Sequence, residues 1–201
     1  MSKMSKKKVI GITGSMGSGK SEISRYLRKK YPVLDCDQVN ADLLKKGNLG
    51  YQKLNDLHIV ELDSNGEIIK ESLASYMFSN IEHRKQVEAI LHPLIFDEMH
   101  KWIHEQESLT VFVEMPILFE ISAQEHFDSI WCVVADLDVA LSRLQTYRNF
   151  TREQAMARLV SQMNPEEKMA KSDIVLRNNS TVEQLHMQIE DALKEEKLNG
   201  D

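Results

Sequence analysis

The sequence has little of what marks a secreted or membrane-spanning protein. Its 201 residues include two cysteines, Cys36 and Cys132, too few for a disulfide framework, so we expect a reducing cytoplasm. No apolar run approaches the roughly 18 residues of a membrane helix, and the run after the basic start is too short for a signal peptide. Internal repeats and low-complexity segments are also missing. These absences favour an ordinary globular protein with no membrane partner.

Charge and composition narrow the partners further. With 25 basic and 31 acidic side chains the formal net charge is −6, which repels nucleic acids, so we expect no nucleic-acid partner. A polyanionic ligand must therefore be held by local positive clusters, and one stretch holds four arginines, Arg143, Arg148, Arg152 and Arg158. A hydrophobic content of 42% at this length permits a sizeable core. For assembly we expect a monomer.

Short apolar runs alternate with helical patterns along the chain. This alternation is typical of an α/β fold in which helices flank a parallel sheet. Between the second and third runs the pattern is helical, which predicts a helical insertion, and Pro93 should end or kink a helix there. The predicted strands lie near 8–13, 32–35, 109–114, 129–135 and 173–176.

The first motif is GSMGSGKS, which matches the phosphate-loop pattern G-x-x-x-x-G-K-[ST] between an apolar run and a helical pattern. Glycines let the backbone curl so that N–H groups point at phosphate oxygens, and the following helix N-terminus adds partial positive charge. Lys20 is expected at the β- and γ-phosphates, and the Ser21 hydroxyl on Mg²⁺. The alternative is a glycine-rich turn without a ligand. The predicted nucleotide-binding residues of the motif are Gly14, Ser15, Met16, Gly17, Ser18, Gly19, Lys20 and Ser21.

Three carboxylates stand at predicted strand ends, where parallel α/β sheets bind their ligands. In extended chain Asp35 and Asp37 share one face, so both could approach the loop, and a carboxylate there can orient an attacking hydroxyl and accept its proton. Glu114 ends the third strand, where phosphate-loop proteins commonly keep a carboxylate for Mg²⁺. The alternatives are a pair of aspartates that caps the next helix and an ordinary exposed glutamate.

The segment after the fourth predicted strand has the features of a lid. Its arginines surround a predicted loop, 147–150, which could close over the nucleotide and place an arginine on the transferring phosphate. Thr151 and Gln154 have the spacing of a capping box. The alternative is a pair of solvated helices with surface arginines. Behind the cap, a stripe that we expect in the core consists of Met156, Leu159, Val160 and Met163, with Arg158 and Gln162 on the opposite side.

Several further elements resemble those of the dephospho-coenzyme A (dephospho-CoA) kinase family. Asp35-Cys36-Asp37 is similar to the family's D-x-D, 90–95 to its L-H-P-x-I element, and 115–120 to its P-L-L-F-E segment. The lid arginines and the stretch 173–179 follow the family's spacing. The resemblance covers nearly the whole chain. It implies transfer of the ATP γ-phosphate to the ribose 3′-hydroxyl of dephospho-CoA, the last step of coenzyme A synthesis.

The resemblance also implies roles for single residues. Asp37 is implied as the base, with Lys20 and Arg148 completing the catalytic set, and Arg148 and Asn178 as nucleotide contacts. The implied acceptor-binding residues are Asp37, His92, Pro116 and Leu118, and the expected Mg²⁺ set is Ser21, Asp35 and Glu114. Departures from the family pattern occur at Glu22, Ile69-Lys70 and Arg177.

For domain organisation we expect one phosphate-loop kinase unit, residues 1–201. It comprises a nucleotide-binding core, a helical acceptor-binding insertion and a lid. The core takes in about 6–37, 108–142 and 166–201, the insertion about 38–107, and the lid about 143–165.

Two other functions fit the phosphate loop. A nucleoside monophosphate kinase needs cations in the acceptor pocket for a 5′-phosphate, and the insertion offers few. A nucleotide-dependent regulatory switch would hydrolyse ATP or GTP slowly, but the chain has no N-K-x-D guanine signature and its paired aspartates favour an acceptor hydroxyl. The cationic residues of the insertion are Lys45, Lys46, Lys53, Lys70, Arg84, Lys85 and Lys101.

Overall fold

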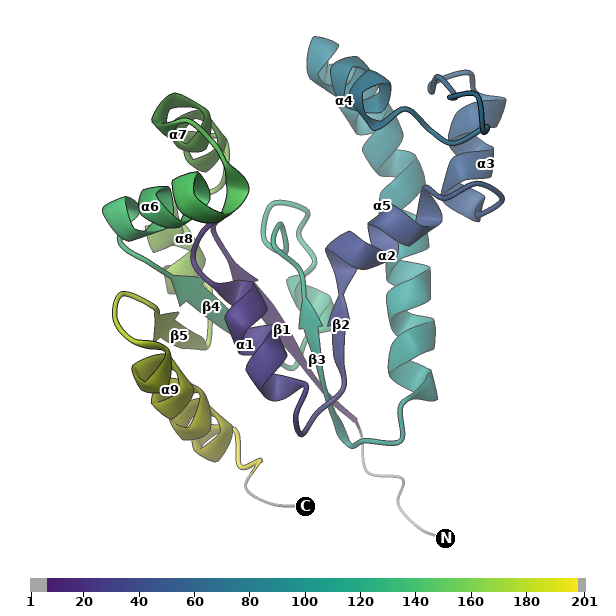
Figure 1. Ribbon diagram of the computed structural model, residues 1–201. Coiled ribbons are helices and arrows are strands. Elements are labelled where there is room, and N and C mark those ends of the chain that lie inside the picture. The colour runs from purple at the N-terminus through teal and green to yellow at the C-terminus, as the bar shows by residue number, and fades with distance from the viewer. Residues whose placement is uncertain (1–6, 199–201) are drawn as a thin grey trace, which may run out of the picture. The chain divides into compact units, whose positions relative to one another are not determined.

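The structure is a computed structural model that describes residues 7–198 (Figure 1). The chain divides into two compact units. We call them the core unit, formed by the residues up to Leu34 and from Gln106 onward, and the helical unit, Asp35–Glu105.

A five-stranded sheet organises the core unit. Its order is β2-β3-β1-β4-β5, with β3 and β4 running parallel to β1 on either side and β5 parallel to β4. Each strand begins and ends within one residue of the apolar run that predicts it, so the expectation of a parallel sheet flanked by helices is confirmed. The strands are β1 (Lys8–Gly14), β2 (Val33–Asp35), β3 (Thr110–Glu114), β4 (Ser129–Val134) and β5 (Ile174–Arg177).

Both units contain helices, and the helical unit is formed mainly of them (Figure 1). Those of the core unit are α1 (Lys20–Leu27), α6 (Leu137–Arg148), α7 (Arg152–Val160), α8 (Pro165–Ala170) and α9 (Val182–Glu195), with a 3₁₀ turn η1 (Gln124–His126). Those of the helical unit are α2 (Cys36–Leu43), α3 (Leu49–Asp56), α4 (Lys70–Ser79) and α5 (Ile81–Glu105). None of the helices between residues 7 and 198 combines the length and apolar character of a membrane span.

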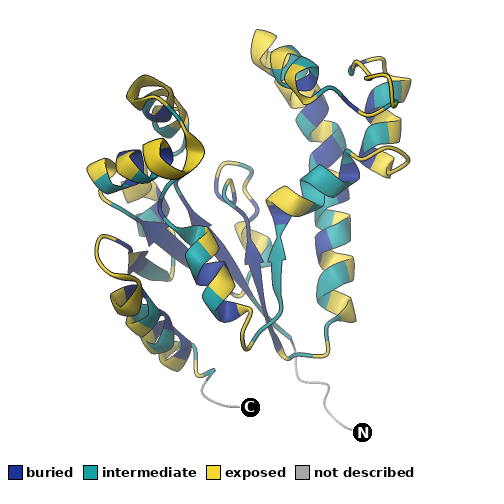
Figure 2. Ribbon diagram, in the orientation of Figure 1, coloured by how far each residue is buried: buried dark blue, intermediate teal, exposed yellow. Residues whose placement is uncertain are grey.

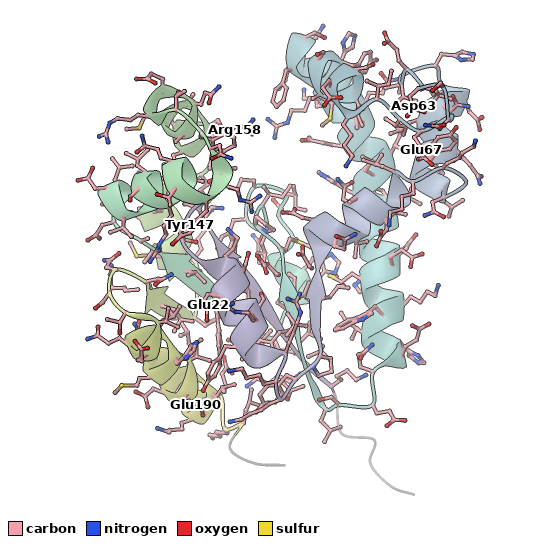
Figure 3. The ribbon with its side chains drawn as sticks, in the orientation of Figure 1. Glu22, Asp63, Glu67, Tyr147, Arg158 and Glu190 are labelled. Carbon is pink, nitrogen blue, oxygen red and sulfur yellow. The ribbon has the colours of Figure 1, made fainter. Side chains whose placement is uncertain are left out.

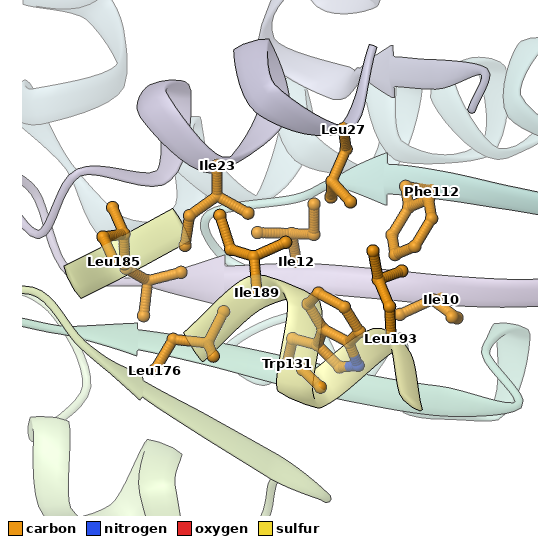
Figure 4. Packing of buried hydrophobic residues seen from close by; sticks show 12 residues of the cluster. Ile10, Ile12, Ile23, Leu27, Phe112, Trp131, Leu176, Leu185, Ile189 and Leu193 are labelled. Carbon is orange, nitrogen blue, oxygen red and sulfur yellow. The ribbon is translucent and has the colours of Figure 1, made fainter. Parts of the chain in front are cut away.

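The main core lies between the sheet and two helices, α1 and α9 (Figure 4). Strand residues alternate between the two faces of a sheet, so Ile10 and Ile12 of β1 enter this core while Gly11 faces the other side, toward Leu118 and Phe127. The central strands are buried on both faces (Figure 2), as expected for a parallel sheet covered by helices. The residues of this core are Ile10, Ile12, Ile23, Leu27, Phe112, Trp131, Val133, Leu176, Leu185, Ile189, Ala192 and Leu193.

The helical unit is built around α5, against which α2, α3 and α4 pack. Val87, Leu91 and Leu94 are buried at roughly helical spacing and turn one face of α5 inward. Of the two outcomes expected at Pro93, a helix end or a kink, the helix end is wrong, because α5 continues through Pro93 to Glu105. Proline removes one backbone donor, and the long buried face of α5 holds the helix together across that position.

Candidate functional site

The phosphate-loop sequence forms a tight turn between β1 and α1. Gly14 has φ 146° and Gly19 has φ 99°, both in the region that side chains rarely adopt. A Cβ on Gly14 would lie 2.2 Å from the Val133 carbonyl oxygen, and one on Gly19 would lie 2.0 Å from Asn178 Nδ2. The glycines therefore serve both the turn and the close approach of neighbouring segments.

Four side chains brace the backbone of this loop. Lys20 Nζ donates to the carbonyl oxygens of Gly14 and Ser15 at 2.9 and 3.0 Å. Asn178 Nδ2 donates to Ser18 O at 2.9 Å, and its Oδ1 accepts from Arg143, whose guanidinium also reaches Gly17 O and Ser18 O at 3.4 and 3.5 Å. On the other side, Met16 N donates to Gln162 Oε1 at 2.9 Å. The loop is thus held from several elements through three or more of its carbonyl oxygens and one N–H group.

The phosphate loop leads directly into the N-terminus of α1. Its N-cap is Gly19, which has no side chain to accept from the first N–H groups, and such uncapped groups together with the helix dipole attract anions. Ser21 lies in the first turn and is exposed. One turn along the same face, Ser24 Oγ donates to Glu114 Oε2 at 2.6 Å, and both side chains are buried. Glu114 is therefore a buried carboxylate at the end of β3, next to the helix that bears Ser21.

Behind the loop lies a cavity of about 340 Å³ within the core unit. Apolar side chains of α6 and α7 form much of its wall. The Ser18 hydroxyl, also on the wall, is buried and has no hydrogen-bond partner within residues 7–198. The cavity thus leaves part of the loop without packing at Ser18, and the hydrogen bonds made by Arg143, Asn178 and Gln162 add support to the loop backbone.

The segment predicted as the lid, 143–165, contains the second half of α6 and all of α7 and lies within the core unit. Leu141, Leu144 and Ala155 are buried together, with Met16 of the loop packed against them. Arg148 is the last residue of α6 and is exposed, whereas Arg158 lies over the Phe150 ring, 4.8 Å from its centroid (Figure 3 labels Tyr147 and Arg158).

Sequence predictions for α7 are confirmed in part. The capping box is present, since Thr151 Oγ1 accepts from Gln154 N and the Gln154 side chain accepts from Thr151 N. The expected core stripe is wrong at Val160, which is 76% exposed, and Ala155 is the one fully buried residue of the helix. A helix with one small buried residue lies on the surface of its unit, so an apolar pattern overstated its burial.

The segment after β3 is anchored by a buried lysine. Lys168 of α8 is completely buried, and its Nζ donates to Pro116 O at 2.9 Å and pairs with Glu120 Oε1 at 2.8 Å. Thr13 Oγ1 also donates to Pro116 O, at 3.1 Å. Leu118 is fully buried, facing Gly11 of β1. Pro116 is therefore held at the carboxyl end of β1, and Leu118 fixes the segment by packing.

Asp35, Asp37 and His92 belong to the helical unit. The expectation that the two aspartates share one face of an extended strand is wrong, because β2 ends at Asp35 and α2 begins at Cys36. Asp35 caps α2, its Oδ1 accepting from Asp37 N at 2.9 Å and Gln38 N at 3.3 Å. Asp37 is exposed in the first turn of α2. Asp35 thus adopts the capping role that the sequence left as an alternative.

His92 lies midway along α5 and is partly buried. Burial lowers the pKa of its imidazole, opposed by the nearby charge of Glu88 and assisted by that of Arg84. The ring is therefore neutral at physiological pH and can donate through one nitrogen while accepting through the other.

Sequence reasoning missed three residues that shape the site. Arg143 is expected with the lid arginines but braces the loop, and Gln162 is expected on a side of its helix that is free to face a ligand or water but accepts from Met16 N. Lys168 carries no expectation from the sequence. Their partners are backbone carbonyl or amide groups far along the chain, and no local sequence signal reports such contacts.

Within residues 7–198 no group of three or more His, Cys, Asp and Glu side chains is arranged to hold a metal ion. Mg²⁺ in phosphate-transfer sites is bound by one or two protein groups plus substrate phosphates and water, so a hydroxyl and a carboxylate are sufficient protein donors. Ser21 and Glu114 supply a hydroxyl and a carboxylate of this kind, and Ser24, one turn along α1 from Ser21, binds Glu114.

Comparison with known proteins gives one consistent family. The family model described as dephospho-CoA kinase matches residues 8–184. A dephospho-CoA kinase from Bacillus cereus is 35% identical over 191 residues, covering 92% of this chain and 96% of the relative. The crystal structure of TT1252 from Thermus thermophilus superimposes with a TM-score of 0.83 at 32% identity, covering 94% of this chain and 98% of that one. A dephospho-CoA kinase from Campylobacter jejuni shares the fold, with a TM-score of 0.70, 24% identity and coverage of 96% and 100%.

Proposed function

Because this chain belongs to the dephospho-CoA kinase family, we propose how its own residues carry out the family's reaction. The protein is an ATP-dependent kinase of coenzyme A synthesis that phosphorylates dephospho-CoA, and the two rival functions are not favoured. The proposal assigns a role to each part of the chain. The core unit binds ATP, the helical insertion (about 38–107) binds the acceptor, and the segment 143–165 acts as the lid. The observation that carries it is the phosphate loop, braced by Arg143 and Asn178 ahead of an uncapped helix.

In this proposal the loop Gly14–Ser21 binds the ATP phosphates through its N–H groups. The Lys20 ammonium, which already lies across the loop, meets the β- and γ-phosphates and offsets the charge that develops during transfer. Arg148 is exposed at the end of α6 and reaches the phosphates from the lid. Asn178, bonded to Ser18 O, acts on the nucleotide through the loop that it holds.

On the acceptor side, Asp37 orients the ribose 3′-hydroxyl and accepts its proton as that oxygen attacks the γ-phosphorus. Its exposure in the first turn of α2 supports the role, because the carboxylate is accessible and the cap made by Asp35 fixes its backbone. Neutral His92 and Pro116 contact the acceptor, and Leu118 supports Pro116 from the core.

Mg²⁺ is part of the proposal. Ser21 and Glu114 would hold it, with Asp35 contributing its second carboxylate oxygen, since Oδ1 already accepts two N–H groups. When bound, the ion would offset the negative charge of the phosphates during transfer. We also propose a monomer in the cytoplasm. Burial raises the pKa of the Cys132 thiol, which keeps this side chain unreactive.

A steady-state assay tests the whole proposal. The protein is incubated with ATP, Mg²⁺ and dephospho-CoA, and both ADP and coenzyme A are measured; AMP and CMP serve as alternative acceptors. We expect ADP and coenzyme A in equal amounts only when all three components are present. Faster turnover with a nucleoside monophosphate would support the first rival, and ADP release without any acceptor would support the switch.

A further inference from the structure

Glu22 places a negative charge in the first turn of the helix that begins the phosphate site. α1 begins at Lys20, so the Glu22 side chain lies within one turn of the N–H groups that attract phosphate. A carboxylate there is favourable for the helix dipole, but it competes with phosphate oxygens for the same partial positive charge and repels them. A kinase with this residue needs a means of keeping the carboxylate away from ATP.

The structure shows where the carboxylate goes. Glu22 Oε1 lies 3.0 Å from His186 Nε2 on α9, and the other oxygen pairs with Arg25 one turn along α1. Glu22 and His186 are only 19% and 27% exposed, whereas Arg25 is 73% exposed and its pairing is weakened by solvent. His186 is therefore the partner that decides the carboxylate's position (Figure 3 labels Glu22).

His186 is itself held in place. Its ring packs on the Tyr26 ring of α1, with centroids 4.2 Å apart and planes inclined by 34°. Its neighbour Leu185 is buried in the main core, and so is Ile189, one turn further on. The imidazole is thus held on the side of α9 that packs against α1.

We propose that His186 is a positioning residue for ATP binding: it holds the Glu22 carboxylate against α9, so that Glu22 stabilises α1 without repelling the nucleotide phosphates. The inference rests on the proposed function in one respect, that the loop Gly14–Ser21 binds those phosphates. Without His186, Glu22 gains freedom to swing toward the N-terminus of α1, where its charge opposes ATP.

The test compares wild type, His186→Ala, Glu22→Gln and the double variant. ATP dissociation constants come from calorimetry, and kcat and KM from the dephospho-CoA assay. We expect His186→Ala to raise the dissociation constant and KM for ATP about fivefold, with kcat at saturating ATP unchanged. In the Glu22→Gln background the same substitution should have no effect, because the amide carries no charge. Raising the salt concentration from 50 to 500 mM should shrink the fivefold effect toward none.

Glu190→Gln is the matched control. Glu190 also joins α9 to α1, accepting from Tyr26 Oη at 2.6 Å and pairing with Lys30, but these residues lie toward the far end of α1. This variant disturbs the same helix pair without releasing Glu22, so ATP affinity should stay at the wild-type value. An equal loss in Glu190→Gln, or a His186→Ala effect that persists beside Glu22→Gln, overturns the inference. Wild-type protein without dephospho-CoA kinase turnover would instead overturn the proposed function.

Discussion

The core unit and the helical unit build their parts of the site by different means. In the core unit the phosphate loop owes its shape to backbone: left-handed glycines and carbonyl groups bonded to Lys20, Arg143 and Asn178. In the helical unit the proposed acceptor residues are side chains at a helix start and on a helix face. We expect removal of one support to weaken ATP binding by the loop, whereas side chains on helices can be changed one at a time.

The two units also differ in how far their elements are buried. The central strands of the core unit are buried along their full length, so the loop starts from a rigid support. In the helical unit α4 buries only Leu73. We therefore expect substitutions in the loop to alter ATP binding and turnover together, and substitutions in the helical unit to affect individual steps.

The largest expected effect is at the loop itself. Lys20→Ala removes the ammonium that we place on the transferring phosphate. We expect kcat/KM to fall on the order of 10³ to 10⁵, by analogy with an arginine that stabilises the same phosphate during transfer. The midpoint of thermal unfolding should change little, because Lys20 is not part of the core. Lys29→Ala, which removes an exposed lysine just after α1, is the control and should be neutral. Wild-type kinetics in Lys20→Ala would refute the phosphate-loop assignment.

Asp37→Asn tests the helical unit's contribution. The amide keeps the size of the side chain but cannot take the 3′-hydroxyl proton, so kcat should fall on the order of 10² to 10⁴, about 3 to 5.5 kcal/mol in the barrier, with dephospho-CoA affinity retained. Steady-state kinetics and acceptor binding by calorimetry measure the two quantities.

Asp35→Ala is the matched comparison, because it removes the cap of α2 but not the proposed base. Loss of an N-cap costs about 1 kcal/mol of stability, and the loss of rate should be smaller than for Asp37→Asn. If Asp37→Asn turns over normally while Asp35→Ala is inactive, the roles of the two carboxylates are reversed.

Asn178→Ala tests whether the loop depends on its supports. It removes the donor to Ser18 O and the acceptor for Arg143, so the loop should loosen and KM for ATP should rise about tenfold. Asn179→Ala breaks hydrogen bonds to Asp136 instead and serves as the neighbouring control, with KM for ATP unchanged. Equal KM values in the two variants would mean that the loop is held by other contacts.

The smallest effect concerns pH and His92. Because burial lowers the pKa of His92 in the folded protein, the unfolded chain binds the proton more readily, and stability is lost as pH falls below the ordinary histidine value of about 6.5. His92→Gln should flatten this loss, as measured by urea unfolding at pH 7.5 and 5.5. Replacement of the exposed His104 by Gln is the control for loss of an imidazole elsewhere on α5. A wild-type slope in His92→Gln would exclude burial of His92 as its source.

Individual residues show which features could be predicted from the sequence and which could not. The phosphate loop was predictable because its determinants are local: glycines at turn positions, then lysine and serine at a helix start. The aspartates after β2 were not, since aspartate is favoured both at a strand end and at an N-cap, and only the turn of the chain into α2 decided between them. The helix end at Pro93 and the burial of Val160 were predicted wrongly for a related reason. At Pro93, packing along α5 overrode the local rule, whereas at Val160 the packing that an apolar pattern predicts is absent.

The sequence by itself determined the strand positions, the parallel α/β class, the phosphate loop and the family resemblance, because hydrophobic period and glycine spacing act over a few residues. Only the tertiary structure decided which distant side chains hold that loop. Arg143, Gln162 and Asn178 bond to its backbone across more than 100 residues of chain, and His186 pairs with Glu22 across 164. Such contacts depend on how strands and helices are ordered around the sheet. This order is a property of the whole fold, and no single stretch of residues determines it.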